Sequence, residues 1–365
     1  MGQLLLAGVT HYPDLNYPDP QMANLLRYAL EDPTVPAKAK DPANWPPTMR
    51  EDWLNHDESA ARHRAQLVEN FRTVRAAIDA FSPDVIVLWG DDQYENFQED
   101  VVPPFCVLSY GETVTYPWRR RRHWDEPPAD EAAGAPNVWH EPADWGIKVF
   151  GAPQIGRWLT GELLARDIDM SYAYRPLHFD GLAHAFLNTV MFLDYDRAGF
   201  PYPVLPVAVN CYGSRVIANH GGPVHFGAEL SETGTLDPPA PAPRRCFAMG
   251  AATAAALAES PWRAVIMASS SWSHAFLTDS TWRLRPDTEH DMVFYDALAD
   301  GRWDVFRDAS LADLEVAGQQ ELLNWCALAG ALAETDASLD YLTLVESNIF
   351  NSNKCFLLAH PGGEP

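Results

Sequence analysis

The sequence predicts an α/β fold in which a central mixed sheet carries helices on both of its faces. Short apolar runs of strand length alternate with longer segments whose apolar residues recur at helical spacing. Several of the apolar runs end in polar residues, as the first does shortly before His11 and the second shortly before Asp91. Open α/β sheets bind ligands beyond the carboxyl ends of their strands, so this pattern indicates a site at one edge of the sheet.

The length of the chain allows one large domain or two ordinary ones, and no linker divides its 365 residues. We therefore expect a single domain over residues 1–365, with irregular excursions at about 14–60, 112–150 and 213–243. The hydrophobic content of 47% and the 13 tryptophans predict a substantial core.

The composition argues against several classes of protein. A formal net charge of −24 argues against nucleic acid and against an anionic membrane surface as partners. No apolar run reaches the roughly 18 residues of a membrane span, and the first residues lack the basic region of a signal peptide, so we expect a cytoplasmic protein. The 5 cysteines form no CxxC pair, which favours buried thiols over disulfides or a zinc site.

The individual elements follow from the apolar runs and from the prolines and polar clusters between them. Strands are predicted over residues 4–9, 85–89, 103–108, 170–174, 203–210, 264–267, 342–346 and 355–358. Helices are predicted over residues 22–30, 58–81, 155–164, 184–193, 244–257, 291–298, 311–314 and 318–332.

Polar residues follow the first two strands at their carboxyl ends. His11 is either a site residue or an ordinary loop histidine. Asp91, Asp92, Gln93 and Glu95 could ligate a metal or orient a substrate, and they could equally form a turn that caps a helix.

A serine-rich stretch, residues 268–278, follows the strand over 264–267. We interpret it either as a pocket floor with His274 pointing inward and Trp272 as a wall, or as a capped turn with a solvated histidine. His178 and His184, which lie before the helix that ends at residue 193, are further candidates.

Glu321 stands among leucines on the apolar stripe of the helix predicted over 318–332. A carboxylate there is costly unless it is paired or bound to a metal. The sequence has no nucleophile elbow, Walker loop or GxGxxG motif, so acyl transfer, nucleotide hydrolysis and dinucleotide redox chemistry have no support. Histidines combined with a carboxylate therefore suggest a metal centre with acid–base groups beside it.

The order of these features resembles the class III (LigB-type) extradiol ring-cleavage dioxygenases. The similarity is spread over short blocks whose order and spacing are shared. They are Gly8 to His11, Ser82 to Cys106, Gly151 to Met170, His184 to Asn210, Arg245 to Gly250, Ser271 to His274 and Gln320 to Leu332.

The resemblance implies a mononuclear non-haem Fe(II) centre. In this family Fe(II) is held by a histidine after the first strand, a histidine after the second and a helix glutamate, which places His11 and Glu321 among the ligands. His184 and His274 match two histidines that act on protons. Beside these groups, Trp272, His178 and Asp92 are expected to bind the substrate.

The chain departs from the family pattern at the second ligand. Where the family has an aspartate followed by a histidine, this chain has Asp92 followed by Gln93. A neutral amide oxygen is a weaker ligand than imidazole for a divalent transition metal. Either Gln93 binds the metal nevertheless, or the metal is lost, or a neighbour takes the position; the candidate neighbours are Asp92, Glu95, His56 and His63.

The resemblance therefore predicts O₂-dependent extradiol cleavage of a catechol-like or related hydroxylated aromatic. The alternatives are a different metal-dependent reaction on the same scaffold and a metal-free binding or scaffold protein. We expect a small aromatic substrate and O₂ as partners and a homodimer as the assembly, although some members of the family need a small partner subunit.

Overall fold

The computed structural model of the protein describes residues 2–119, 134–176, 178, 181–215 and 236–362. Its strands are β1 (Gln3–Val9), β2 (Val85–Asp91), β3 (Phe105–Leu108), β4 (Thr113–Thr115), β5 (Ile147–Val149), β6 (Ser171–Ala173), β7 (Val204–Val209), β8 (Arg263–Ser269), β9 (Ser338–Val345) and β10 (Lys354–His360). Its helices are α1 (Asn24–Glu31), α2 (Ala37–Lys40), α3 (Pro47–Leu54), α4 (His56–Phe81), α5 (Pro153–Ala165), α6 (His184–Leu193), α7 (Pro243–Glu259), α8 (Thr288–Ala299), α9 (Asp304–Arg307), α10 (Leu311–Val316) and α11 (Leu322–Glu334).

Eight strands of the described chain form one mixed sheet in the order β6-β3-β7-β2-β8-β1-β10-β9. The central strands β7, β2, β8 and β1 are parallel, so their carboxyl ends lie at the same edge of the sheet. β10 runs antiparallel to both β1 and β9, and β3 runs antiparallel to β7. β4 and β5 form a separate antiparallel pair.

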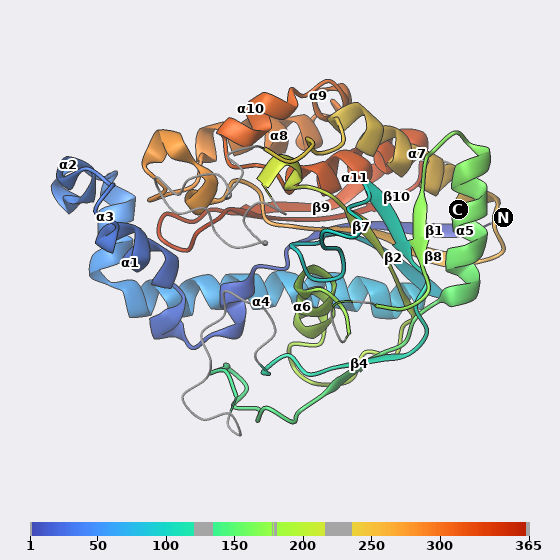
Figure 1. Ribbon diagram of the computed structural model, residues 1–365, viewed down its shortest axis with the longest axis horizontal. Coiled ribbons are helices and arrows are strands. Elements are labelled where there is room, and N and C mark those ends of the chain that lie inside the picture. The colour runs from blue at the N-terminus through green and yellow to red at the C-terminus, as the bar shows by residue number, and fades with distance from the viewer. Residues whose placement is uncertain (1, 120–133, 177, 179–180, 216–235, 363–365) are drawn as a thin grey trace.

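Helices cover both faces of the sheet (Figure 1). α7 and α11 pack on one face together with α5, α8 and α9, and α4 and α6 pack on the other. Because both faces are covered, the central strands are buried along nearly their whole length, which explains why they appear in the sequence as continuous apolar runs. The predicted α/β fold with a central mixed sheet is confirmed.

The first excursion is more regular than the sequence predicts. The chain between residues 14 and 60 forms α1, α2, α3 and short 3-10 turns before α4 begins, so the expectation of an irregular segment with one short helix is wrong. Its prolines stand at the starts of these elements, as Pro36 does before α2 and Pro47 does at the first residue of α3. Proline is tolerated there because the first N–H groups of a helix have no intrahelical partner.

The other two excursions are described in part. Residues 112–150 include the β4–β5 pair, which the sequence does not predict, and residues 120–133 lie outside the described residues. Of residues 213–243, the segment 216–235 lies outside them as well. Within the described ranges, no helix combines the length and apolarity needed to cross a membrane.

Candidate metal centre

Three of the predicted site residues meet in one buried cluster at the carboxyl edge of the parallel strands. His11 Nε2 lies 3.5 Å from Glu321 Oε2, and His274 Nε2 lies 3.4 Å from Glu321 Oε1. All three side chains are buried. They come from the end of β1, the segment after β8 and the start of α11, so the fold joins residues that lie hundreds of positions apart in the sequence.

Asp91, the last residue of β2, brings a second carboxylate into this cluster. Its Oδ1 lies 3.3 Å from His11 Nε2, and its side chain is fully buried. Among the described residues, neither Asp91 oxygen has a hydrogen-bond partner, and neither does Glu321 Oε2. Burial, followed by the charge of Glu321, raises the pKa of Asp91 well above its ordinary value.

The His11 ring is oriented so that the lone pair of its Nε2 faces the carboxylates of Asp91 and Glu321. Its Nδ1 lies 3.0 Å from the carbonyl oxygen of Ser269, a geometry in which the Nδ1–H donates. The Asn188 side chain donates to the His11 carbonyl oxygen at 3.1 Å and fixes the backbone. Burial lowers the pKa of His11 to about 4, against the opposing effect of Glu321, so the ring is neutral at pH 7.

The arrangement fits a divalent metal ion. Ligand atoms of His11, Asp91 and His184 all lie within 4.8 Å of one another. Two ligands bound at about 2.1 Å on neighbouring coordination positions are roughly 3.0–3.4 Å apart, close to the separations of His11 Nε2 from the two carboxylates. A cation placed between buried carboxylate oxygens that have no hydrogen-bond donor and a neutral imidazole nitrogen stabilises all of these groups.

His184, the first residue of α6, is held by a carboxylate. Its Nδ1 lies 2.7 Å from Glu95 Oε2, and its backbone N–H donates to Glu95 Oε1 at 3.0 Å. The ring centres of His184 and His11 are 5.1 Å apart, edge to face. Glu95 thus fixes Nδ1 as the protonated nitrogen and leaves Nε2 as the acceptor.

Glu321 precedes α11 instead of lying on its apolar stripe. It occupies the N-cap position, which corrects the helical placement predicted from the sequence. Its Oε1 accepts a 2.6 Å hydrogen bond from the Tyr212 hydroxyl and faces His274, while its Oε2 faces His11. Burial alone would raise the pKa of Glu321, but His274 and His11 together hold it below its ordinary value.

The serines after β8 connect the segments that carry the site residues. Ser269 Oγ contacts Thr189 Oγ1 of α6 at 2.6 Å, and Ser271 Oγ contacts Thr10 Oγ1 at 2.8 Å. Ser270 donates to the Glu321 carbonyl oxygen at 2.9 Å. These hydroxyl groups therefore form hydrogen bonds that connect different elements, whereas one interpretation of the sequence places them on the floor of a pocket.

Asp291 of α8 accepts hydrogen bonds from segments that adjoin His274 and Glu321. This buried carboxylate accepts from Ser273 N at 3.0 Å, from Gln319 Nε2 at 2.5 Å and from Asn353 Nδ2 at 2.7 Å. Ser273 adjoins His274, and Gln319 lies two residues before Glu321. The sequence does not point to Asp291, because a single acid in an amphipathic helix resembles a solvated one.

The other predicted site residues lie in different surroundings. Asp92 accepts from Glu95 N at 3.0 Å and from Asn96 N at 2.9 Å, so it caps the turn after β2. Gln93 is half-buried in that turn. Trp272 is fully buried and packs its ring edge-on against Trp325, with the centroids 5.4 Å apart.

The three other histidines that the sequence offers as candidates lie away from the cluster. His178 Nε2 contacts Asp100 Oδ1 at 2.7 Å near the surface. His56 is half-exposed at the start of α4. His63 is buried in α4, where it stacks on Phe350 with ring centroids 4.8 Å apart. A substrate contact of Trp272, Asp92 or His178 stays a prediction from the sequence.

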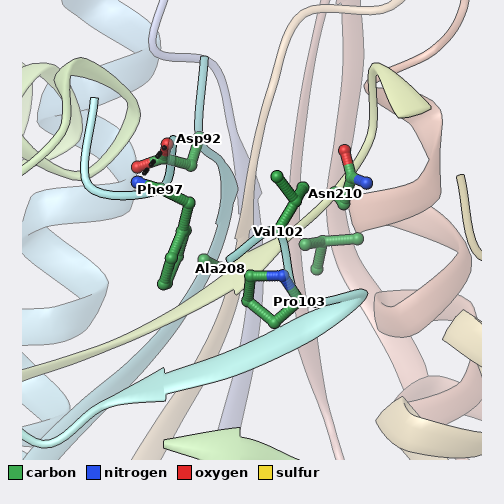
Figure 2. Close-up of a pocket in the computed structure, with 7 residues that line it drawn as sticks. Asp92, Phe97, Val102, Pro103, Ala208 and Asn210 are labelled. Carbon is green, nitrogen blue, oxygen red and sulfur yellow. Dashed lines mark hydrogen bonds between the residues drawn. The ribbon is translucent and has the colours of Figure 1, made fainter. Parts of the chain in front are cut away.

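Figure 2 shows a small pocket formed by residues of β7, of the turn after β2 and of the segment before β3. Val209, one of its lining residues, is the register partner of Asp91 between β7 and β2. The other lining residues are Asp92, Phe97, Val102, Pro103, Ala208 and Asn210. The pocket is therefore lined mainly by apolar side chains, and Asp92 is the carboxylate among its lining residues.

Asp91 and Tyr212 are the site residues that the sequence reasoning did not single out. Asp91 is named there only as part of the polar cluster after β2, and Tyr212 is not named at all. Strand alternation is the signal for Asp91, because it shares a face of β2 with Trp89 and Val87, both of which pack toward α11. Tyr212 leaves no comparable signal in the sequence.

Comparison with known proteins supports the resemblance. A 2,3-dihydroxyphenylpropionate/2,3-dihydroxicinnamic acid 1,2-dioxygenase of Pseudomonas putida is 30% identical over 147 residues, which cover 40% of this chain and 37% of that protein. The enzyme of the same name from Comamonas testosteroni is 28% identical over 159 residues, which cover 44% of this chain and 40% of that protein. That from Rhodococcus globerulus is 41% identical over 54 residues, which cover 15% and 17%.

The aligned segments span about two fifths or less of the length of these relatives. Residues 233–357 match the family model described as the catalytic LigB subunit of aromatic ring-opening dioxygenase, a segment that includes His274 and Glu321. Residues 233–357 are therefore similar to the catalytic subunit of that family, in agreement with the resemblance.

Proposed function

We propose that this protein is an extradiol-type dioxygenase that cleaves the ring of a catechol-like or related hydroxylated aromatic with O₂ at a mononuclear Fe(II) site. The observation that carries this proposal is the meeting of His11, Asp91, Glu321, His184 and His274 in one buried cluster. The LigB domain and the names of the curated relatives support it.

The ion would be held by His11, by Glu321 and by a third ligand from residues 91–93, where the sequence predicts Gln93. A bound Fe(II) would supply open coordination positions for the two catechol oxygens and for O₂. The reaction breaks one carbon–carbon bond of the ring beside the diol, and both atoms of O₂ enter the product. The ring itself supplies the electrons that reduce O₂.

His274 would take the proton of a catechol hydroxyl. Its Nε2 lies beside Glu321 Oε1, the carboxylate oxygen turned away from His11, and its Nδ1 has no hydrogen-bond partner among the described residues. An imidazole with an available nitrogen next to the bound diol is suited to general base catalysis.

His184 would act later, during oxygen–oxygen cleavage and ring opening. The Glu95 carboxylate holds its Nδ1, so Nε2 is the nitrogen that would exchange a proton, in a ring whose centre lies 5.1 Å from that of His11. Two histidines on separate elements thus let one site remove a proton and return one.

The substrate would be a vicinal diol on an aromatic ring, and 2,3-dihydroxyphenylpropionate is the first compound to test because the curated relatives are named for it. We further propose that the protein works in the cytoplasm as a homodimer without a small partner subunit. Light scattering after size-exclusion chromatography tests the assembly, and a monomer would contradict it.

The activity is tested with the purified full chain, loaded anaerobically with Fe²⁺ and mixed with a panel of catechols in aerated buffer. The expected result is equimolar consumption of O₂ and the appearance of a yellow ring-cleavage product. His274→Ala should reduce kcat about 100-fold or more, as expected for loss of a general base. Iron-loaded protein that consumes no O₂ with any diol would refute the proposal.

A further inference from the structure

We propose that Asp91 is the third protein ligand of the metal, so that one histidine and two carboxylates hold the ion in place of the two histidines and one carboxylate of the family. This inference rests on the proposed metal site and concerns which residue replaces the missing histidine. It assigns a role to a residue of this chain that the family pattern does not provide.

The first argument is the chemistry of the atoms that meet. Asp91 Oδ1, Glu321 Oε2 and the Nε2 lone pair of His11 are all acceptors, and Nε2 lies 3.3 Å and 3.5 Å from the two oxygens. Neither carboxylate oxygen has a hydrogen-bond donor in the described chain. Acceptors held this close without a donor repel one another, and a cation between them removes the repulsion.

The second argument is the position of each candidate on the backbone. Asp91 is the last residue of β2, and its side chain lies on the strand face that is covered by α11. Glu321, which matches the glutamate ligand of the family, directly precedes this helix. Asp92 points to the opposite side, where it caps the turn through Glu95 and Asn96. Gln93 falls in that turn, beyond the end of the strand.

The replacement changes the preferred metal. Two carboxylates and one neutral imidazole cancel the charge of a divalent ion, whereas one carboxylate leaves a single positive charge. Oxygen ligands favour Mn²⁺ and Fe²⁺ over softer ions at a given site. We therefore expect the site to hold Mn²⁺ as well as Fe²⁺.

The experiment is a binding titration of the metal-free full chain with Mn²⁺, followed by the electron paramagnetic resonance signal of free Mn²⁺. The wild type should bind one equivalent. Asp91→Asn should weaken the affinity about 100-fold, while Gln93→Ala should change it less than about 3-fold. Asp57→Asn, which removes an exposed acid of α4, controls for a general loss of negative charge.

A folding readout separates loss of a ligand from loss of structure. Without metal, Asp91→Asn should melt at the same temperature as the wild type or higher, because it replaces a buried carboxyl group whose charge is disfavoured by burial and by Glu321. Added Mn²⁺ should raise the melting temperature of the wild type and of Gln93→Ala but not that of Asp91→Asn.

The failures of the two proposals are distinguishable. Metal affinity that survives Asp91→Asn but is lost in Gln93→Ala overturns the assignment of Asp91 and leaves the ring-cleavage proposal intact. A wild-type protein that binds neither Mn²⁺ nor Fe²⁺ overturns both. A protein that binds metal through Asp91 but cleaves no catechol retains this inference and refutes the proposed function.

Discussion

The contact between Glu95 and His184 shows how one carboxylate decides which nitrogen of a histidine is available. Both Glu95 oxygens bind the same residue, one through the ring and one through the backbone N–H. The turn that carries Glu95 is itself fixed by Asp92. The side chain that caps the turn therefore also determines the orientation of a proposed acid–base group.

Glu95→Gln should lower kcat about 10- to 100-fold, because the amide no longer fixes the tautomer of His184. Metal affinity and thermal stability should change little. Glu112→Gln, at an exposed partner of Lys148, is the control and should leave kcat unchanged. If the variant instead loses metal with kcat per bound metal preserved, then His184 is a ligand and not a proton carrier.

Lys354 is a buried cation at the start of β10. Its Nζ donates to the Phe350 carbonyl oxygen at 2.8 Å, lies 3.1 Å from His63 Nε2 and sits 3.7 Å from the centre of the Tyr12 ring. Burial lowers its pKa well below the usual 10.5, although the charge of Asp14 opposes the shift. The folded protein therefore binds this proton less tightly than the unfolded chain does.

A lysine whose pKa is lower in the folded state destabilises the fold at neutral pH, and this effect fades as pH rises toward the unfolded pKa. The free energy of unfolding of the wild type should therefore rise relative to that of Lys354→Met between pH 7 and pH 10. Denaturant titrations at both pH values measure it. Lys148→Met, at a half-exposed lysine, should show no such difference from the wild type.

At this scale the sequence predicts part of the site. His11, His274 and Glu321 are found from their positions after strands and from the resemblance, and the structure brings them together. Asp91 is not singled out, because a residue type at a strand end does not reveal which oxygens remain without donors. Tyr212 depends on a contact across 109 positions, which no local pattern encodes.

The helices α7 and α11 are packed with their backbones in contact. A Cβ at Gly250 of α7 would overlap the carbonyl oxygen of Ala327, and a Cβ at Gly330 of α11 would overlap that of Phe247. The two glycines thus allow a crossing closer than side chains permit. The same crossing sets the position of the first turn of α11, next to Glu321.

Gly250→Ala and Gly330→Ala should each destabilise the protein by about 3 kcal/mol, because the helices must separate to admit a methyl group. Metal affinity should fall as well, since α11 carries Glu321 at its start. Gly161→Ala in α5 is the matched control: nothing lies within 4 Å of its added Cβ, and it should stabilise by about 0.5–1 kcal/mol. Equal unfolding midpoints for all three variants would contradict the close crossing.

Most elements are predictable because their apolar period is local. The sequence places β1, β2, β7 and β8 and the long helices α4, α7 and α11 within a few residues of their bounds. It misses β4 and β5, whose strands are short and only partly buried, and α9, which has one turn. It misinterprets the prolines of residues 14–60 because a proline begins a helix as readily as it ends one.

At the scale of the whole molecule, the net charge of −24 should affect which of the proposed catechol substrates approach the site fastest. A negative field repels an anionic substrate and leaves a neutral one unaffected, and salt screens it. For a catechol that carries a carboxylate, kcat/KM should rise about 3-fold or more between 10 and 200 mM NaCl.

For unsubstituted catechol, kcat/KM should change little over the same range of NaCl concentration. The difference between the two substrates then measures the electrostatic contribution to substrate approach. Steady-state O₂ uptake with both substrates measures it. A parallel response of the two substrates would mean that salt acts on the protein and not on the approach of the substrate.

The place of β1 in the sheet has a consequence for synthesis. In the folded protein this strand lies between β8 and β10, whose residues 263–269 and 354–360 leave the ribosome much later than residues 3–9 do. Its backbone therefore has neither of its two strand partners while more than 200 further residues are translated. We therefore expect chaperones that bind exposed apolar segments to bind the Gln3–Val9 segment of the nascent chain.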